Sequence, residues 1–202
     1  MADPIAVVVV AGGASARLGT FKPLATLKGR PLISWTLDIA FEISPSVYLL
    51  LKDSEQEPLL RDAMSGRSVK IIIEPSDGTP YPASLSRCLS AVSEDLIFLM
   101  GCDTPMLDPR LPGLLQDRMG SSSAAVPVWP NGYIEPLAAL YRRSSLPQGA
   151  KINNMRELLD VMKAKPVKIE DLGVPPASFF NVNSKEDLEL AGIMLQILSI
   201  ST

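Results

Sequence analysis

Two cations, Arg17 and Lys22, follow a run of small residues near the start of the sequence. The run is AGGAS at residues 11–15, directly after the six apolar residues IAVVVV at 5–10. Glycine lets the backbone approach a ligand closely, and backbone N–H groups together with cations bind phosphate oxygens. A buried strand, a glycine turn and positive charge therefore predict a phosphate-binding loop. A plain tight turn is the alternative for Gly12 and Gly13 taken alone.

A carboxylate, Asp103, is the second candidate group, because it follows the apolar run LIFLMG at residues 96–101. A carboxylate in a tight turn at the end of a strand is well placed to bind a magnesium ion that bridges phosphates. The alternative is an Asx-turn, in which Asp103 bonds only its own backbone. A shared sheet edge with the glycine loop favours the metal-binding interpretation.

The absence of histidine narrows the chemistry. It excludes Ser–His and Cys–His nucleophiles and histidine metal sites, so any metal must be a hard cation held by oxygen, such as magnesium or manganese. Cys88 and Cys102 are too few for a disulfide framework and are predicted to be buried, inert thiols. The net charge of −3 and the short apolar runs favour a soluble, cytoplasmic protein with no nucleic-acid or membrane partner.

Alternating strands and helices must position these groups. Apolar stretches predict strands at 5–10, 46–51, 69–74 and 96–101, and helical patterns predict helices at 32–43, 55–64 and 82–92. This order indicates βαβ units in a parallel sheet with both faces covered. Ligands of such sheets lie at the carboxyl ends of the strands, so the loops after Val10, Glu74 and Met100 are the candidate functional loops.

The second half of the chain is less regular. Strands are predicted at 124–128 and 136–141, joined through a hairpin signal at Asn131-Gly132. A helix at 154–164, a strand at 166–169 and a last helix at 184–198 follow. Ser184 and Asp187 form a capping-box pattern for the last helix. Its inward residues are predicted to be Leu188, Ala191, Leu195 and Leu198.

Residues 11–24, written as A-G-G-x-S-x-R-x-G-x-x-K-P-L, resemble the N-terminal signature of nucleotidyltransferases, above all the molybdenum cofactor guanylyltransferases (the MobA family). The stretches CDTPML at 102–107, EPLAALYRR at 135–143 and FFNVNSKEDL at 179–188 resemble later motifs of that family. The resemblance implies an α/β fold of the nucleotide-diphospho-sugar transferase type, with a Rossmann-like, mostly parallel sheet. It also implies one domain over 1–202, with a nucleotide-binding half at 1–110 and an acceptor-binding half at 111–202.

The activity implied by the resemblance is Mg²⁺-dependent transfer of GMP from GTP to the terminal phosphate of molybdopterin, with release of pyrophosphate. Lys22, Arg17 and Asp103 would be the catalytic residues, and Asp103 would also hold the metal. The residues implied to bind the nucleotide are Ala11, Gly12, Gly13, Ser15, Lys22, Lys52, Asp77 and Asp103, and those implied to bind the acceptor are Pro136, Leu137, Asn181 and Asn183. Other proteins of cofactor biosynthesis, or acceptor proteins, are the implied protein partners.

Alternatives remain for several of these residues. Asp77 could be a solvated loop acid, and Asn183 or Ser184 could simply cap a helix. Phe21 and Lys52 depart from the acidic residue and the asparagine that the family usually has at these positions.

The substrates also remain open. The Gly12-Gly13 pair favours guanine, whereas Ala-Ser-Leu at 83–85 is more like cytidylyltransferase relatives. A guanylyl- or cytidylyltransferase acting on another phosphate, such as adenosylcobinamide phosphate, is one alternative. A non-catalytic GTP-binding relative is the other.

Overall fold

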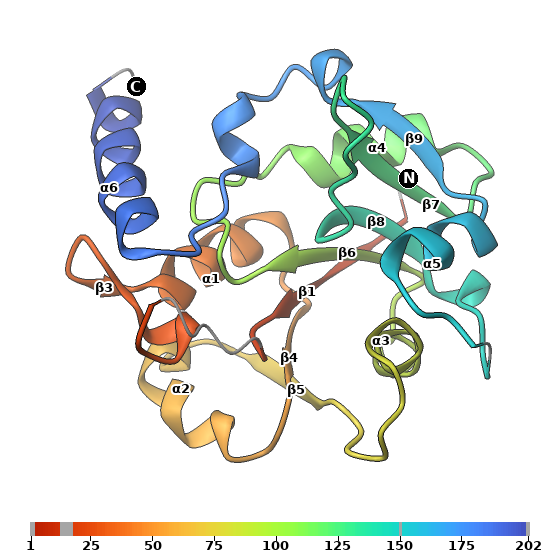
Figure 1. Cartoon of the computed structure of the whole chain (residues 1–202), viewed down its shortest axis with the longest axis horizontal. Helices are drawn as coiled ribbons and strands as arrows, with labels where there is room; N and C mark the ends of the chain where they lie inside the picture. The colour runs from red at the N-terminus through yellow and green to blue at the C-terminus, as the bar shows by residue number, and fades with distance from the viewer. Residues whose placement is uncertain (1–2, 13–17, 150, 201–202) are drawn as a thin grey trace.

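A seven-stranded sheet forms the centre of the molecule (Figure 1). The computed structural model describes residues 3–12, 18–149 and 151–200. In spatial order the strands are β5 (Val69–Ile73), β4 (Val47–Leu51), β1 (Ile5–Val10), β6 (Leu96–Gly101), β8 (Ala138–Arg142), β7 (Ala124–Val128) and β9 (Lys165–Lys168). Among these described strands, only β8 runs antiparallel to its neighbours. The mostly parallel α/β sheet expected from the sequence is therefore confirmed.

Helices cover both faces of the sheet and bury two hydrophobic clusters. Val7 and Val9 of β1 pack on one face with α1 (Leu32–Ile43), α2 (Gln56–Met64) and α4 (Leu111–Met119). Ala6 and Val8 pack on the other face with α3 (Tyr81–Leu89) and α5 (Met155–Val161). Because successive side chains of a strand point to opposite faces, a strand covered on both sides must be apolar throughout. This explains the run of apolar residues in β1.

The last helix, α6 (Lys185–Ile200), packs against a two-stranded hairpin of β2 (Thr26–Leu27) and β3 (Arg30–Pro31) at the edge of the molecule (Figure 1). The predicted capping box is confirmed, because Ser184 Oγ accepts from Asp187 N and Asp187 Oδ2 accepts from Ser184 N. The prediction for Leu198 was wrong. Leu198 is 41% exposed, because the buried contacts of α6 are made earlier in the helix, around Ala191.

Other differences from the sequence-based expectation have local causes. Helix α4 was not predicted, because Pro112 and Gly113 weaken the helical pattern of its sequence. Helix α3 ends before Val92, where i→i−3 backbone bonds replace the helical ones. Strand β8 begins at Ala138 instead of residue 136, because the chain before it bulges out of the sheet. Short 3₁₀ helices occupy Lys22–Leu24, Arg143–Ser145, Ile169–Asp171 and Pro176–Phe179.

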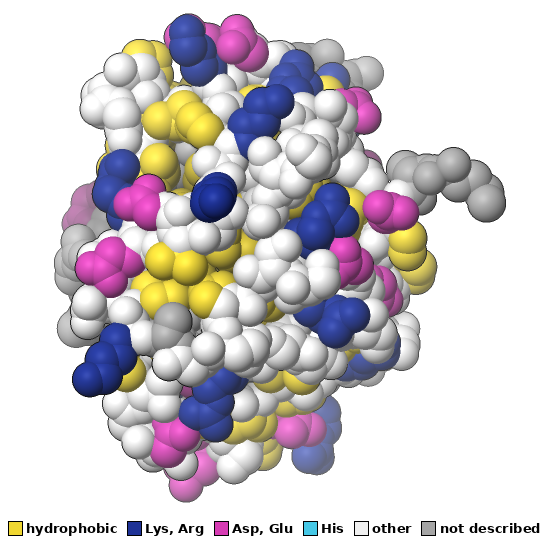
Figure 2. Space-filling view, turned by 90° about the vertical axis from the view of Figure 1, so that its right-hand side faces the viewer, with side chains coloured by type: hydrophobic (Ala, Val, Ile, Leu, Met, Phe, Trp, Pro, Cys, Tyr) yellow, Lys and Arg dark blue, Asp and Glu magenta, His cyan; other side chains and the backbone are white. Residues whose placement is uncertain are grey.

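The surface charge is mixed and the two cysteines are buried, as the composition led us to expect. Lys or Arg side chains are interspersed with Asp and Glu side chains on the face drawn in Figure 2, without a large area of one sign. None of the described helices is both long enough and apolar enough to cross a membrane. Cys88 and Cys102 are both unpaired and buried, and burial raises the pKa of the Cys88 thiol to about 11. Burial also raises the pKa of the Cys102 thiol, so both thiols are protonated at neutral pH, as expected for inert cysteines.

Candidate active site

Three loops begin side by side at one edge of the sheet. After β1 the chain moves outward to β4 and β5 and then returns to form β6 on the other side of β1, which makes this edge a topological switch point. The sheet bonding continues into each loop: Ala11 N donates to Leu50 O (2.9 Å), Cys102 N to Val10 O (3.0 Å) and Glu74 N to Leu51 O (2.8 Å). The loops after residues 10, 74 and 100 therefore meet where the sequence predicted a ligand site.

A cluster of one cation and two oxygen-bearing side chains lies at this edge. Lys22 Nζ donates to Asp103 Oδ2 at 2.8 Å and to Asn183 Oδ1 at 2.7 Å, although these residues are far apart in the sequence. The Lys22 and Asp103 side chains are only 14% and 18% exposed. Val182 N also donates to Asp103 O at 2.9 Å, which ties the segment before α6 to the turn after β6. The structure thus brings together Lys22, Asp103 and Asn183.

Hydrogen bonds hold the turn that carries Asp103 in one conformation. Thr104 Oγ1 donates to Gly101 O at 2.9 Å, and the buried Thr36 of α1 donates to Cys102 O at 3.0 Å. A Cβ atom at Gly101 would lie 2.4 Å from Asp103 Oδ1, so glycine leaves room for the carboxylate. The Asp103 carboxylate accepts from Lys22, and no bond from its own backbone is found among the described residues. The structure therefore does not support the Asx-turn alternative for Asp103.

The donor chemistry of the cluster suits a hard divalent cation. Asp103 and Asn183 both present oxygen atoms to the Lys22 ammonium, which shows that a positive charge is stabilised between them. Mg²⁺ prefers such oxygen ligands and is commonly held by one or two carboxylates plus substrate phosphates. Within the described ranges, no three Asp, Glu or Cys side chains lie together in a way that could hold a metal ion. A metal at Asp103 would therefore need further oxygen ligands, such as Asn183 or the phosphates of a substrate.

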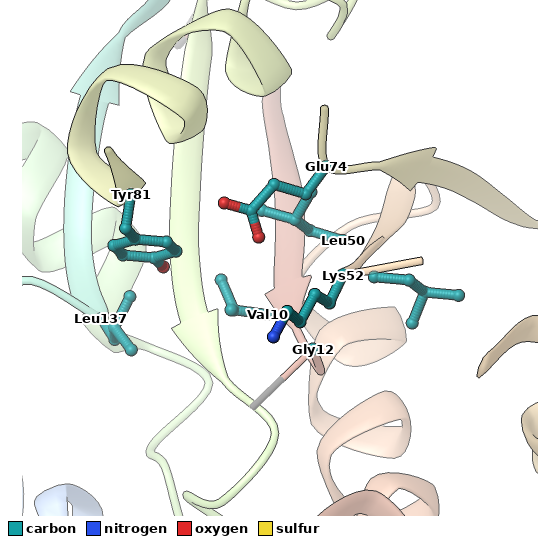
Figure 3. Close-up of a pocket in the computed structure, with 8 residues that line it drawn as sticks. Val10, Gly12, Leu50, Lys52, Glu74, Tyr81 and Leu137 are labelled. Atoms are coloured by element: carbon teal, nitrogen blue, oxygen red, sulfur yellow. The ribbon is translucent and has the colours of Figure 1, made fainter. Parts of the chain in front are cut away.

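An apolar pocket of about 470 Å³ lies beside this cluster. Its lining comes from the ends of β1, β4 and β5 with the chain that follows them, and from the chain before β8: Val10, Gly12, Leu50, Leu51, Lys52, Glu74, Tyr81 and Leu137. Figure 3 shows the Lys52 ammonium and the Glu74 carboxylate directed into this pocket from the ends of neighbouring strands. A Cβ atom at Gly12 would lie 2.7 Å from Lys52 N, so the close approach of the two loops requires glycine.

Glu74 is a candidate that the sequence reasoning missed. Ser84 Oγ of α3, a fully buried residue, donates to Glu74 Oε1 at 2.6 Å and fixes the direction of the carboxylate. Burial, reinforced by the Glu74 charge, raises the pKa of Tyr81 to about 12, so its phenol keeps its proton at neutral pH. The available signal was position, because Glu74 follows β5 directly, as Gly12 and Asp103 closely follow β1 and β6.

Asp77, the acid predicted in this loop, is bonded elsewhere. Its Oδ1 accepts from Thr79 N (3.1 Å), which makes an Asx-turn, and its Oδ2 accepts from Arg87 (2.6 Å). The hydrogen bond from Arg87 is the main reason that the pKa of Asp77 lies far below its usual value. Its side chain is 49% exposed, and it does not line the pocket with Glu74. Nucleotide binding by Asp77 stays a prediction, and the geometry favours Glu74.

The remaining predicted residues are distributed around the site. Leu137 lines the pocket, Pro136 precedes it, and Asn181 Nδ2 donates to Phe179 O at 3.0 Å. Ala11 continues the sheet bonding after β1, and Phe21 packs against the hydrophobic cluster on the α1 face. Gly13, Ser15 and Arg17 lie outside the described residues, so their predicted roles stay predictions.

Comparison with known proteins identifies the group to which this architecture is similar. Residues 7–169 match the family model described as a MobA-like NTP transferase domain. A protein of Pyrococcus horikoshii named probable molybdenum cofactor guanylyltransferase is 32% identical over 192 residues, covering 90% of this chain and 96% of that protein. A protein of the same name from Bacillus licheniformis is 27% identical over 90% of this chain and 93% of its own length.

Solved structures share the fold at lower sequence identity. Molybdopterin-guanine dinucleotide biosynthesis protein A from Archaeoglobus fulgidus superposes with a TM-score of 0.73 at 22% identity, covering 94% of this chain and 98% of that chain. A 4-diphosphocytidyl-2C-methyl-D-erythritol synthase from Anaerococcus prevotii gives a TM-score of 0.68 at 13% identity, over 97% of this chain and 100% of that chain. The same fold therefore occurs in proteins whose names indicate different bases.

Proposed function

The chain belongs to the family of MobA-like NTP transferase domains and is a nucleotidyltransferase, and from this premise we propose that it transfers GMP from GTP to the terminal phosphate of molybdopterin. The names of its relatives support this choice of nucleotide and acceptor. We assign the nucleotide to residues 1–110 and the acceptor to residues 111–202 of one domain. The observation that carries the proposal is the Lys22–Asp103–Asn183 cluster at the sheet edge where β1 and β6 end.

The chemistry asks for little beyond charge and position. An oxygen of the acceptor phosphate forms a bond to the α-phosphorus of GTP, and the bond from that phosphorus to the bridging oxygen breaks, so pyrophosphate leaves with the electron pair. The attacking phosphate is already an anion at neutral pH, so no general base is needed, which agrees with a chain that lacks histidine. Lys22 would neutralise charge on the phosphates and orient them. Bound through Asp103, Mg²⁺ would supply further neutralisation of phosphate charge.

Glu74 supports guanine as the base. An ionised carboxylate accepts hydrogen bonds and donates none. Guanine presents two adjacent N–H donors on its pairing edge, whereas adenine and cytosine each place a ring-nitrogen acceptor next to their amino group. Ser84 donates one hydrogen bond to Oε1 of Glu74, so the carboxylate can still accept hydrogen bonds from a base in the pocket. A site built to accept two N–H donors discriminates strongly against a base that lacks one of them.

The test is pyrophosphate release measured with GTP, CTP or ATP against molybdopterin or adenosylcobinamide phosphate, in Mg²⁺ and in excess EDTA. We expect release with GTP and molybdopterin, and its loss in EDTA. Release with CTP, or with the cobinamide phosphate alone, would reject this choice of substrates. GTP binding without release for either acceptor would reject catalysis altogether, and unchanged release in EDTA would reject the role of the metal.

The Glu74→Gln variant tests the base assignment. The amide replaces one acceptor by a donor, so it faces a guanine N–H group with the wrong polarity. Hydrogen bonds to charged groups are worth about 1.5–3 kcal/mol, so the KM for GTP should rise by about tenfold or more. The matched control is Glu57→Gln, which changes an exposed acid on α2. An unchanged KM and an unchanged preference for GTP over CTP would show that Glu74 does not recognise the base.

A further inference from the structure

The residues just before β8 reach the same sheet edge as Asp103. Because β8 is antiparallel to β6, the first residue of β8 lies beside the end of β6, in the register Met100↔Ala138. Gly101 N also donates to Leu137 O at 3.2 Å. The segment 135–137 is therefore anchored next to the turn that carries Asp103.

This segment is a rigid bulge. The chain from Ile134 to Leu140 contains more residues than the stretch of β7 opposite it, so residues 135–137 are pushed out of the sheet. Their backbone is held at several atoms: Glu135 N donates to Pro127 O (3.0 Å), Ala138 N to Glu135 O (3.1 Å) and Tyr141 Oη to Pro136 O (2.8 Å). A bulge held in this way presents its side chains in a fixed direction.

The Glu135 side chain is oriented by a tryptophan. Trp129 Nε1 donates to Glu135 Oε1 at 2.7 Å. The indole in turn packs edge-to-face against Phe179, with ring centroids 5.7 Å apart. The carbonyl oxygen of Phe179 accepts from Asn181, so the predicted acceptor residues and Glu135 belong to one connected set.

The second carboxylate oxygen of Glu135 has acceptor capacity left. No partner for Oε2 is found within the part of the chain that the structure describes. Burial raises the pKa of Glu135, the Trp129 hydrogen bond opposes this, and the Asp103 charge adds to the increase. The bond from Gly101 N to Leu137 O and the register Met100↔Ala138 hold the segment that carries this carboxylate next to the Asp103 turn. A half-buried acceptor beside an aromatic pair suits a ligand that brings its own N–H donors.

Resting on the proposed function, we propose that Glu135 recognises the acceptor substrate by accepting hydrogen bonds from the N–H edge of a fused heteroaromatic ring. A 2-amino-4-oxopteridine, the ring of the proposed acceptor, carries two adjacent N–H donors of this kind. Trp129 acts as a positioning residue that keeps one oxygen of Glu135 occupied and the other directed at the ligand. Glu74 and Glu135 thereby read similar donor edges on the nucleotide and on the acceptor.

The decisive variant is Glu135→Gln, which is nearly isosteric and keeps an oxygen for the Trp129 N–H. We expect the KM for molybdopterin to rise at least about tenfold, with the KM for GTP within about twofold of wild type. Trp129→Phe keeps the ring but frees Glu135, so it should raise the same KM by a smaller factor. Glu189→Gln, an exposed acid on α6, is the control. An unchanged KM for molybdopterin in Glu135→Gln would overturn the inference.

A binding experiment gives a readout that does not depend on turnover. In the presence of GTP, wild type should bind pterin more tightly than lumazine, which has a carbonyl in place of the 2-amino group. Glu135→Gln should lose this preference. Equal affinity of wild type for the two rings would also overturn the inference.

Two further outcomes separate this inference from its alternatives. If Glu135→Gln lowers the affinity for Mn²⁺, measured by electron paramagnetic resonance with GTP, and keeps the pterin preference, Glu135 is a metal ligand and the inference is wrong. If wild type transfers no GMP to molybdopterin, the proposed function fails. If wild type transfers GMP and the Glu135→Gln variant is unaffected, the inference about Glu135 is refuted and the proposed function stands.

Discussion

The parallel strands β4, β5, β1 and β6 and the antiparallel strand β8 bring side chains to the same edge by opposite routes. Lys52, Glu74 and Asp103 follow the carboxyl ends of parallel strands. Glu135 and Leu137 precede the amino end of β8, because β8 runs in the opposite direction to β6. In a mixed sheet, therefore, the residues before an antiparallel strand are site candidates in the same way as those after a parallel strand.

The two regions also hold their side chains differently. The loops of the parallel region contain glycines where chains approach closely, as at Gly12 beside Lys52 and Gly101 beside Asp103. The bulge before β8 contains no glycine and is fixed by hydrogen bonds alone, including one from the fully buried Tyr141, whereas the parallel region uses hydrogen bonds and glycines together. Substitutions in the parallel region should therefore affect the nucleotide and the chemical step. Substitutions of Glu135 and of the residues that hold the bulge should affect the acceptor, whereas Leu137 also lines the pocket proposed for the base.

The largest effect is expected in the parallel region, from Lys22→Ala and Asp103→Ala. Each removes a charge that would act on the phosphates or their metal, and such groups contribute about tenfold or more to turnover. The measurement is kcat for pyrophosphate release, with thermal unfolding as a check that both variants fold. Lys165→Ala and Asp117→Ala remove exposed charges on β9 and α4 and serve as controls. Full activity of either site variant would show that its residue has no catalytic role.

A smaller, selective effect is expected from Tyr141→Phe in the antiparallel region. The variant loses the hydrogen bond to Pro136 O, which should lower the free energy of unfolding by about 1 kcal/mol and Tm by about 2–4 °C. The loosened bulge should raise the KM for molybdopterin a few-fold without changing the KM for GTP. Tyr133→Phe, in an exposed turn of the same hairpin, is the control. Equal changes in both KM values would contradict the division between the two regions.

The smallest effect concerns Asp77, an acid of the parallel region that lies outside the pocket. Its pKa is lowered mainly by the hydrogen bond from Arg87, so the pair stabilises the fold above the unfolded-state pKa of about 3.9. That contribution should disappear as the pH falls through the lower pKa of the folded state. Carboxyl ¹³C NMR should show Asp77 still ionised near pH 3 in wild type and titrating at higher pH in Arg87→Gln, where the Thr79 hydrogen bonds still keep its pKa below the usual value. Identical titration in both proteins would exclude the pairing.

The sharpest comparison for GTP is between Asp77→Asn and Glu74→Gln. Because Asp77 already has partners within its own loop, Asp77→Asn should change the KM for GTP by less than about twofold. A larger effect in Asp77→Asn than in Glu74→Gln would return the nucleotide-binding role to Asp77.

Asp103 and Asp77 show how far the sequence could be interpreted. Asp103 was a candidate because it follows an apolar strand, with an Asx-turn as the alternative, and Asp77 was a candidate because of the family resemblance, with a solvated loop acid as the alternative. In the structure the Asx-turn occurs at Asp77, and Asp103 pairs with Lys22. The difference depends on where Arg87 and Lys22 lie in space, and sequence spacing does not contain that information. Local pattern could therefore identify candidate carboxylates without deciding between their roles.

The sequence by itself determined the buried strands, the helices that connect the first four of them and the edge at which the loops meet. It could do so because apolar periodicity and chain direction are local properties, and parallel strands bring their carboxyl ends to one edge whatever the details of packing. Only the tertiary structure decided that Asn183 joins Lys22 and Asp103, that Glu74 enters the pocket, and that Glu135 reaches the same edge. These contacts join residues distant in the chain, and they arise from strand order and from the reversed direction of β8.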